Sequence, residues 1–273
     1  GFFHANRGDL MAEIPDSHPR KRSLLSREKI VQGSEKGLLA KSAMIAHGRG
    51  EAFDYLLGER TGESAGAAIR ESVARLRKAD KPVISVNGNT VVLAGKGALR
   101  LAAALGCAIE VNLYYRTPER VSGLLSLLEE QRSSVLMEPE PPGFEGDWLE
   151  SVRRVPLLGS SPDFRIEGLE GPRSNCTEAG IGSADSILVP LEDGDRCEAL
   201  VNLGKEVIVI DLNPLSRSAK MATVTVVDEV SRAFDAMLAE LVANPNCAPT
   251  EWDNSSALRS AVVEIGDYLL SKS

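Results

Sequence analysis

The sequence runs Ile187-Leu-Val-Pro-Leu-Glu-Asp-Gly-Asp-Arg-Cys-Glu-Ala-Leu200 and, shortly after, Val207-Ile-Val-Ile-Asp-Leu-Asn-Pro-Leu-Ser-Arg217, and these two stretches decide its fold class. In each, an apolar run that suits a buried strand stops at a cluster of charged and amide side chains. The carboxyl ends of strands in an open parallel sheet bind ligands, because the loops there diverge and leave a crevice. Carboxylates and arginines at two such ends suit a phosphate-bearing ligand and its Mg²⁺, which indicates nucleotide chemistry.

Further apolar runs of strand length alternate with helical patterns outside these stretches. We expect strands at 82–88, 108–113, 135–137, 186–191, 207–212 and 222–227, with helices between them that include 99–105, 117–131 and 230–241. Such alternation indicates an α/β fold, in which helices cover both faces of a parallel sheet. The Val, Ile and Leu content of the strands indicates burial on both sides.

The rest of the chain predicts one large domain with additions. We expect residues 1–10 to be a disordered extension and 11–245 to be a single α/β catalytic domain. Its N-terminal helices lie within 23–80. We expect one helix at 23–37, a second stretch at 40–45 and 51–57 that a glycine-rich segment interrupts, and a third at 65–79. The sheet core spans 81–245. Five prolines in 138–165 predict a surface insertion, and 254–271 predicts a C-terminal helix whose apolar side could dock on the sheet or form a subunit interface.

Composition excludes several classes of protein. The net charge of −8 argues against general nucleic-acid binding. No apolar run approaches the roughly 18 residues of a membrane helix, and the start lacks the layout of a secretion signal, so we expect a cytoplasmic protein without membrane contact. The four cysteines form no C-x-x-C pair, which argues against a structural zinc site or a disulfide framework.

Basic residues and glycines near the start suggest an anion site. Five basic residues crowd into ten positions, either as a receptor for a small anion or as a solvated face: Arg20, Lys21, Arg22, Arg27 and Lys29.

Further on, His47 and Arg49 lie among glycines ahead of a helical run. The glycines would let a ligand approach the backbone, the helix start would add N–H donors, and the arginine fork suits phosphate. The alternative is a simple turn between helices that His47 caps.

Polar residues also follow or interrupt the first two predicted strands. Asn87-Gly-Asn89 could hold a substrate hydroxyl or carboxylate, or it could simply turn the chain. Glu110 and Asn112 alternate along the second strand and would point to one side of the sheet. For this pair a structural hydrogen bond competes with a catalytic role.

The later strand ends carry the sharpest candidates. Asp195 and Arg196 could contact Mg²⁺ or a substrate, although Asp195 could instead cap the next helix. Asp211 could bind ribose hydroxyls, Asn213 could read a base or a phosphate, and Arg217 could neutralise phosphate charge. The sequence has no G-x-x-x-x-G-K-[ST] phosphate loop and no G-x-G-x-x-G after a strand, so a nucleotide site must be built differently.

Together these residues resemble the archaeal 4-phosphopantoate–β-alanine ligase family, also called phosphopantothenate synthetases. The resemblance runs from about Met11 to Ala233 and is carried by six motifs: Ser17-His-Pro-Arg20, Ile45-Ala-His-Gly-Arg-Gly-Glu-Ala-Phe-Asp-Tyr-Leu-Leu-Gly-Glu59, Pro82-Val-Ile-Ser-Val-Asn-Gly-Asn89, Glu110-Val-Asn-Leu113, Val189-Pro-Leu-Glu-Asp-Gly-Asp-Arg196 and Ile210-Asp-Leu-Asn-Pro-Leu-Ser-Arg217.

The resemblance implies a homodimeric, Rossmann-like enzyme of coenzyme A biosynthesis. It implies that ATP, with Mg²⁺, drives the condensation of 4-phosphopantoate with β-alanine to 4′-phosphopantothenate through an acyl-adenylate, with release of AMP and diphosphate. By position, the ATP contacts fall on Arg27, Arg49, Asp211, Leu212, Asn213, Arg217, Ser218, Glu229 and Val230. Substrate contacts are assigned to Arg20, Asn87, Asn89, Asn112, Asp195 and Arg196.

Four positions depart from the family pattern. Lys21 stands where an aromatic residue is usual, Cys197 and Ser218 where threonine is usual, and Glu229 where asparagine is usual. Ser218 keeps a hydroxyl. At Glu229 a carboxylate replaces a neutral amide, so a backbone contact with the nucleotide is the one expected to survive.

The implied reaction brings a carboxylate to the α-phosphorus of ATP and therefore needs cations. Arg49 and Arg217 are the candidate phosphate clamp, with Arg27 beside them, and His47 is the candidate base for the amine. Two other hypotheses are a nucleotide-binding module without turnover and a pantoate-type kinase. The missing phosphate loop argues against the kinase.

Overall fold

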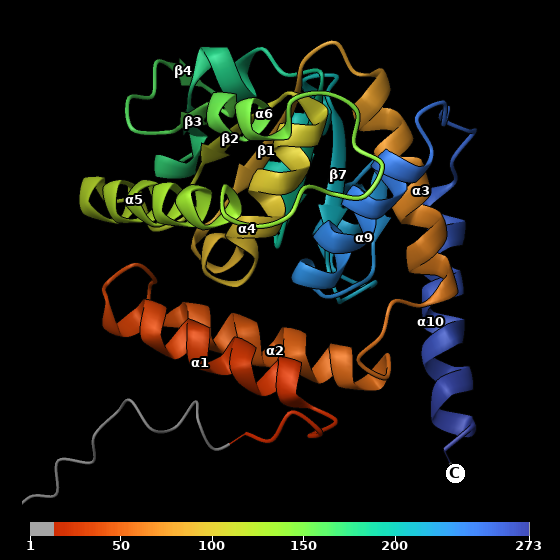
Figure 1. The fold of residues 1–273 in the computed structure, drawn as a ribbon. Helices are drawn as coiled ribbons and strands as arrows, with labels where there is room; N and C mark the ends of the chain where they lie inside the picture. Colours follow the sequence, from red (N-terminus) through yellow and green to blue (C-terminus); the bar gives the residue numbers. More distant parts are fainter. Residues whose placement is uncertain (1–13, 273) are drawn as a thin grey trace, which may run out of the picture.

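The computed structural model describes residues 14–272, which fold around one parallel sheet of order β3-β2-β1-β6-β7-β8 (Figure 1). The strands are β1 (Pro82–Val86), β2 (Ala108–Val111), β3 (Leu157–Leu158), β6 (Ser186–Pro190), β7 (Glu206–Ile210) and β8 (Val224–Val226). When only the six strands of this sheet are numbered along the chain, their order is 3-2-1-4-5-6, which is the order of the Rossmann fold. The predicted fold class is therefore confirmed.

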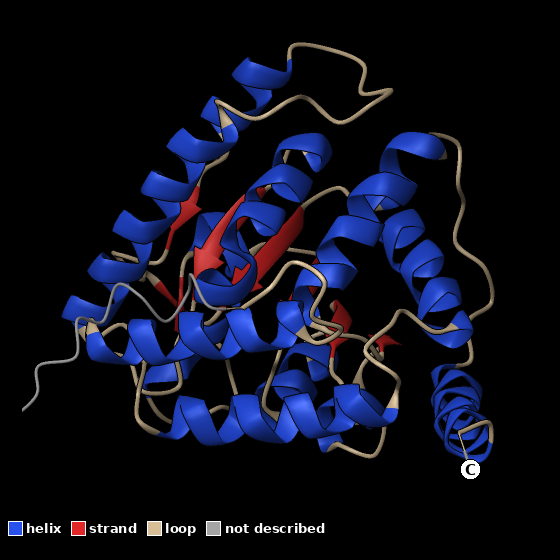
Figure 2. Cartoon of the chain, turned by 60° about the horizontal axis from the view of Figure 1, so that its bottom comes forward, coloured by secondary structure: helices blue, strands red, loops and turns tan. Residues whose placement is uncertain are grey.

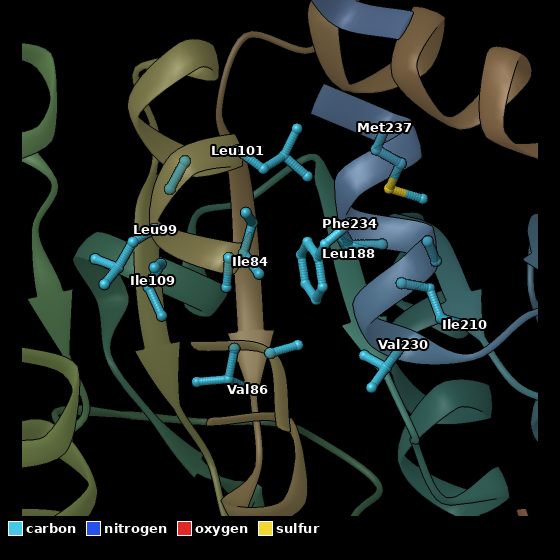
Figure 3. Close-up of a cluster of buried hydrophobic side chains, with 14 of the residues drawn as sticks. Ile84, Val86, Leu99, Leu101, Ile109, Leu188, Ile210, Val230, Phe234 and Met237 are labelled. Atoms are coloured by element: carbon cyan, nitrogen blue, oxygen red, sulfur yellow. The ribbon is translucent and has the colours of Figure 1, made fainter. Parts of the chain in front are cut away.

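Alternate side chains of β1, β6 and β7 enter two separate cores, because successive residues of a strand point to opposite faces. On one face, Ile84 and Ile210 pack with Phe234 against α3 (Glu63–Lys78), α4 (Gly88–Leu105), α5 (Pro118–Val135) and α9 (Val230–Ala243) (Figure 3). On the other face, Val83 and Val209 pack against α7 (Gly194–Asn202) and the segment that carries the hairpin β4 (Phe164–Arg165) and β5 (Asn175–Cys176). Each fully buried side chain of this size stabilises the fold by about 1.5–3 kcal/mol.

The N-terminal segment forms a helical hairpin of α1 (Lys21–Glu35) and α2 (Ser42–Leu56), which lies across one end of the molecule (Figures 1 and 2). The predicted interruption between 45 and 51 is wrong, because α2 runs through Gly48 and Gly50 without a break. Neither glycine takes a positive φ. Each costs about 1 kcal/mol in a helix, which packing of the rest of the helix offsets.

The segment after α5 also differs from expectation. The strand predicted at 135–137 is wrong, because Val135 ends α5 and a turn follows. The edge strand is β3, which pairs with β2 through Ile109 and Leu157 and lies within the segment predicted as a surface insertion. That segment also carries α6 (Trp148–Arg154), whose Trp148 is buried in the larger core. A strand of two residues is too short to produce a period in the sequence.

Two short turns, at Pro172–Ser174 and Glu178–Gly182, and the helix α8 (Arg217–Met221) complete the elements before the C-terminal helix α10 (Asn254–Leu270). Leu258 and Ala261 of α10 pack with Leu212 and Val227, so one side of this helix docks at the end of the sheet. The extension predicted at 1–10 lies outside the described residues. Within 14–272, no helix has both the length and the apolar character needed to span a membrane.

Candidate active site

One cavity, called the main cavity from here on, lies where the strand order reverses direction, between β1 and β6. From this point the chain adds β2 and β3 on one side and β6, β7 and β8 on the other, so the loops diverge. A cavity of about 280 Å³ opens here between α2 and the carboxyl ends of the strands. Its walls include Arg22, His47, Glu51, Asp54, Asn87, Asn89, Tyr114, Tyr115, Arg120, Leu191, Leu212, Glu229, Val230 and Arg232.

His47 lies in the cavity wall contributed by α2. Its Nε2 is buried and has no hydrogen-bond partner within residues 14–272. Burial lowers the pKa of His47, against the smaller opposing effect of Glu51, so the neutral imidazole is favoured. A buried polar atom without a partner needs an explanation, and a neutral imidazole facing a cavity can accept a proton from a bound amine.

Arg49 faces away from the cavity. It lies two residues beyond His47 on the continuous helix α2, hence about 200° further around the helix axis. Arg49 is exposed, and among the described residues it forms no ion pair. The helix-start N–H donors predicted beside it are absent, because α2 begins at Ser42 and has no second start here.

Arg20 and Arg27 both bind a carboxylate of α2. Glu51 Oε1 lies 2.7 Å from Arg20 Nη2 and 2.6 Å from Arg27 Nη2. Arg20 Nε lies 2.6 Å from Glu59 Oε1. The hydrogen bond from Arg27 holds the pKa of Glu51 below its ordinary value. Both arginines are therefore paired with Glu51, and these ion pairs tie Arg20 and α1 to α2.

The two asparagines after β1 organise the cavity wall. Asn87 caps α4, since its Oδ1 accepts from the Thr90 N–H at 3.0 Å, and its Nδ2 donates to the Leu191 carbonyl at 3.1 Å. Asn89 Nδ2 donates to the Ala43 carbonyl of α2 at 3.2 Å. Asn87 therefore joins β1 to the loop after β6, and Asn89 joins α4 to α2.

The loop after β7 is held by its own side chains. Asp211 accepts from the Asn213 N–H at 2.9 Å and from the Ser216 hydroxyl, and Ser216 caps α8. Burial raises the pKa of Asp211. The Ser218 hydroxyl donates to the Glu192 carbonyl at 2.7 Å, which joins this loop to the one after β6.

Arg217 begins α8 and is exposed. Its guanidinium lies 2.6 Å from Asp195 Oδ1 and 3.0 Å from Glu198 Oε2. The hydrogen bond from Arg217 also holds the pKa of Asp195 below its ordinary value. Asp195 does not cap α7, because Asp193 does. Within the described chain, the main cavity is lined by neither Arg217 nor Arg49, so the two predicted clamp residues do not share it.

Glu229 and Arg232 place partly buried charge at the end of β8. Glu229 caps α9 and lines the cavity with Val230. Burial would raise the pKa of Glu229, but hydrogen bonds from the Ser231 hydroxyl and from the N–H groups of Ser231 and Arg232 hold it below its ordinary value. The carboxylate is therefore ionised and committed to the helix start.

Sequence reasoning missed Arg232 as a site residue. Its guanidinium binds Asp54 of α2 at 3.0 Å and Asp228 at 2.7 Å. Asp228 stands four residues before Arg232, which is the spacing of a helical ion pair and the one signal the sequence offered. Asp54 is distant in the chain, so its part in this network could not be seen.

A smaller cavity of about 90 Å³ adjoins the first, and Asn87, Tyr114 and Leu191 line both. Arg196 lines it and binds Glu192 as well as the Ser85 hydroxyl, at 3.0 Å. Other residues in its walls are Asn112, Arg173, Glu192 and Asp193.

Arg173 was missed because it lies in a segment without a clear strand or helix pattern. Its Cζ lies 4.5 Å from the centre of the Tyr114 ring, and its Nη2 lies 3.1 Å from Asp195 Oδ2. Asn112 holds this segment in place, since its Nδ2 donates to the carbonyls of Arg173 and Asn175.

Glu110 makes structural hydrogen bonds, which is one of the two interpretations given from the sequence. It is buried and accepts from the N–H groups of Thr177 at 2.6 Å and Ile181 at 2.7 Å, so its partners are backbone groups and not Asn112. Across 14–272, no three His, Cys, Asp or Glu side chains gather in a way that could hold a metal ion.

Comparison with known proteins shows the family of this chain. Residues 64–267 match the model of the family described as phosphopantothenate/pantothenate synthetase. The chain is similar to the protein named 4-phosphopantoate–β-alanine ligase in Thermococcus onnurineus, at 48% identity over 266 residues that cover 95% of this chain and 94% of that protein. Proteins of the same name are 47% identical in Thermococcus kodakarensis (95% and 94% covered) and 42% identical in Methanosarcina mazei (95% and 96% covered). The chain therefore belongs to the phosphopantothenate/pantothenate synthetase family.

Proposed function

We propose that this protein is an ATP-dependent ligase that condenses 4-phosphopantoate with β-alanine to 4′-phosphopantothenate in coenzyme A biosynthesis. Its relatives, similar over nearly their whole length, are named for a ligase of these two substrates. The structural observation that carries the proposal is the main cavity at the β1–β6 switch point, with His47 in its wall and the buried Nε2 of His47 without a partner among the described residues.

In the first half of the proposed reaction, the acid's carboxylate attacks the α-phosphorus of ATP, the bond from this phosphorus to diphosphate breaks, and an acyl-adenylate forms. Two anions must approach, so arginines have to offset their repulsion. Arg217 and Arg27 now bind Asp195 and Glu51, and bound phosphate would take the place of these carboxylates. Mg²⁺ arrives with the nucleotide phosphates.

The proposed second half joins the amine to the acyl group and releases AMP. The amine must first lose its ammonium proton, and a neutral His47 can accept it. Lowering of the His47 pKa by burial suits this role, because the base is then free of its own proton near neutral pH.

We also infer a homodimer from the surfaces beside Arg49 and Arg217. Ile45 is 68% exposed and lies one helical turn before Arg49, on the same side of α2. Leu215 is 64% exposed and lies two residues before Arg217. Large exposed apolar side chains mark interaction surfaces. A partner subunit on these surfaces would bring Arg49 of one chain toward Arg217 of the other.

The test of the proposed function is the identity of the nucleotide product. The protein is incubated with ATP, Mg²⁺, 4-phosphopantoate and β-alanine, and the nucleotides are separated. AMP with diphosphate, together with 4′-phosphopantothenate, is the expected result. ADP would indicate a kinase, and unchanged ATP that nevertheless binds would indicate a module without turnover.

A further inference from the structure

The smaller cavity, called the arginine cavity from here on, contains two guanidinium groups with an unused donor each. The Arg196 side chain is 4% exposed, and its two Nη groups bind Glu192 and Ser85. Arg173 uses Nη2 on Asp195. The Nε of both arginines is buried and has no partner within the described chain. A buried donor without an acceptor is unfavourable, so two of them on residues that line one cavity indicate an oxyanion site.

Charge decides which oxyanion suits the arginine cavity. Glu192 pairs with Arg196, and Asp193 Oδ1 lies 3.6 Å from Arg173 Nη2. Two carboxylates thus balance the two guanidinium groups in the walls. A phosphate dianion would meet as much negative as positive charge here. A zwitterion with one carboxylate and one ammonium would find a partner of opposite sign for each end.

Size leads to the same choice. The volume of the arginine cavity is about 90 Å³, compared with about 280 Å³ for the main cavity. This suits β-alanine, with its short unbranched chain. It does not suit 4-phosphopantoate, which carries a branched chain and a phosphate.

We propose that the arginine cavity binds β-alanine, with its carboxylate against Arg173 and Arg196. This inference rests on the proposed function, because β-alanine is the amine of that reaction. The amine end then points along Asn87, Tyr114 and Leu191, which line both cavities, toward the acyl group held in the main cavity.

That orientation is the one the chemistry needs. The nitrogen, having lost its ammonium proton, attacks the acyl carbon of the adenylate. The bond from this carbon to the AMP oxygen breaks, AMP leaves with the electron pair, and a second proton leaves the nitrogen as the amide forms. The carboxylate of β-alanine takes no part in these steps, so its binding can be separated from them.

Arg173→Gln tests this assignment, because it keeps hydrogen-bonding capacity and removes the charge. The KM for β-alanine is expected to rise about ten- to one-hundred-fold, as for loss of a hydrogen bond to a charged group. Exchange of labelled diphosphate into ATP, measured with 4-phosphopantoate and without β-alanine, is expected to stay near the wild-type rate. Arg173→Lys should recover part of the affinity, since it restores the charge without the planar fork.

A second measurement uses β-alaninamide, which lacks the carboxylate charge. The wild-type enzyme is expected to prefer β-alanine strongly over this amide, and Arg173→Gln to lose most of the preference. Arg165→Gln is the matched control: this exposed residue lies on the same hairpin and is absent from the walls of the arginine cavity, so both measurements should stay unchanged.

Two results would overturn the assignment. A raised KM for 4-phosphopantoate with loss of diphosphate exchange would give the arginine cavity to the acid. Unchanged kinetics with both amines would make Arg173 purely structural. A wild-type protein that forms no 4′-phosphopantothenate is a different failure, because it removes the proposed function before any variant is compared.

Discussion

At the scale of single residues, His47 combines a cavity position, an Nε2 without a partner in residues 14–272, and a pKa lowered by burial from 6.5. Burial disfavours the protonated form, so the base stays neutral above its lowered pKa and is lost as the pH falls through it. We expect kcat/KM for β-alanine to decline only below about pH 6.5. His47→Gln should lower kcat about 10²- to 10⁴-fold, as for loss of a general base. It should also abolish the decline of kcat/KM at low pH. Rates measured between pH 5 and 8 check this, and an identical decline in the variant would exclude His47 as the base.

The positions of the site residues could be predicted, but not what their side chains bind. Asn87, Asp211 and Ser218 follow strands at the predicted edge, as their place in the sequence required. Yet Asn87 is committed to Thr90 and to the Leu191 carbonyl, and Ser218 to the Glu192 carbonyl. The Leu191 and Glu192 carbonyls are distant in the sequence and are brought near only by the pairing of strands. Sequence spacing cannot show that a polar group is already satisfied.

At the scale of elements, the strands and the long amphipathic helices could be predicted because burial gives them a pattern. β6 and β7 are the apolar runs of the deciding stretches. Thr117 caps α5 as expected. The failures lie where packing overrides local preference, in the continuous helix α2 and in the two-residue strand β3.

The continuity of α2 can be tested by filling its glycines. A Cβ added at Gly48 would meet no atom within 4 Å, and its φ is not positive. Gly48→Ala should therefore raise the free energy of unfolding by about 0.5–1 kcal/mol, measured by urea denaturation. Gly58→Ala is the contrast: φ is +80° and the new Cβ would lie 2.6 Å from Tyr268 Cζ, so it should destabilise. A Gly48→Ala protein that is less stable would favour the broken helix predicted from the sequence.

The link between α2 and α9 is a second test at this scale. Arg232 binds Asp54 and Asp228, which are 3% and 1% exposed. Arg232→Met leaves both carboxylates buried without a cation, which should cost about 3–5 kcal/mol of unfolding free energy at neutral pH. The deficit should shrink in acid, because a protonated carboxyl needs no cation. Arg259→Met, on the exposed side of α10, should change stability by less than about 0.5 kcal/mol. Equal effects of the two substitutions would contradict the network.

At the scale of the whole molecule, the two arginines of the phosphate clamp predicted from the sequence do not line the main cavity. Arg49 lies on the exposed side of α2, and Arg217 lies at the start of α8 with Asp195 and Glu198 as its partners. Sequence reasoning could group these arginines by chemistry but could not place them in space. In the proposed homodimer, a second subunit that packs on the exposed Ile45 and Leu215 beside them would complete the site.

Complementation between inactive variants tests whether two subunits share the clamp. Arg49→Ala and Arg217→Ala should each lose most activity while remaining folded, because each removes an exposed side chain. If one site takes Arg49 from one chain and Arg217 from the other, co-expression gives mixed dimers in about half of the molecules, each with one intact site of two. Activity should then return to about a quarter of the wild-type level. If both arginines serve the site of their own chain, or if the protein is a monomer, each variant spoils its own site and the mixture stays inactive. Mixing the two purified proteins under conditions that prevent subunit exchange gives the baseline, and only a rise above it supports a shared site.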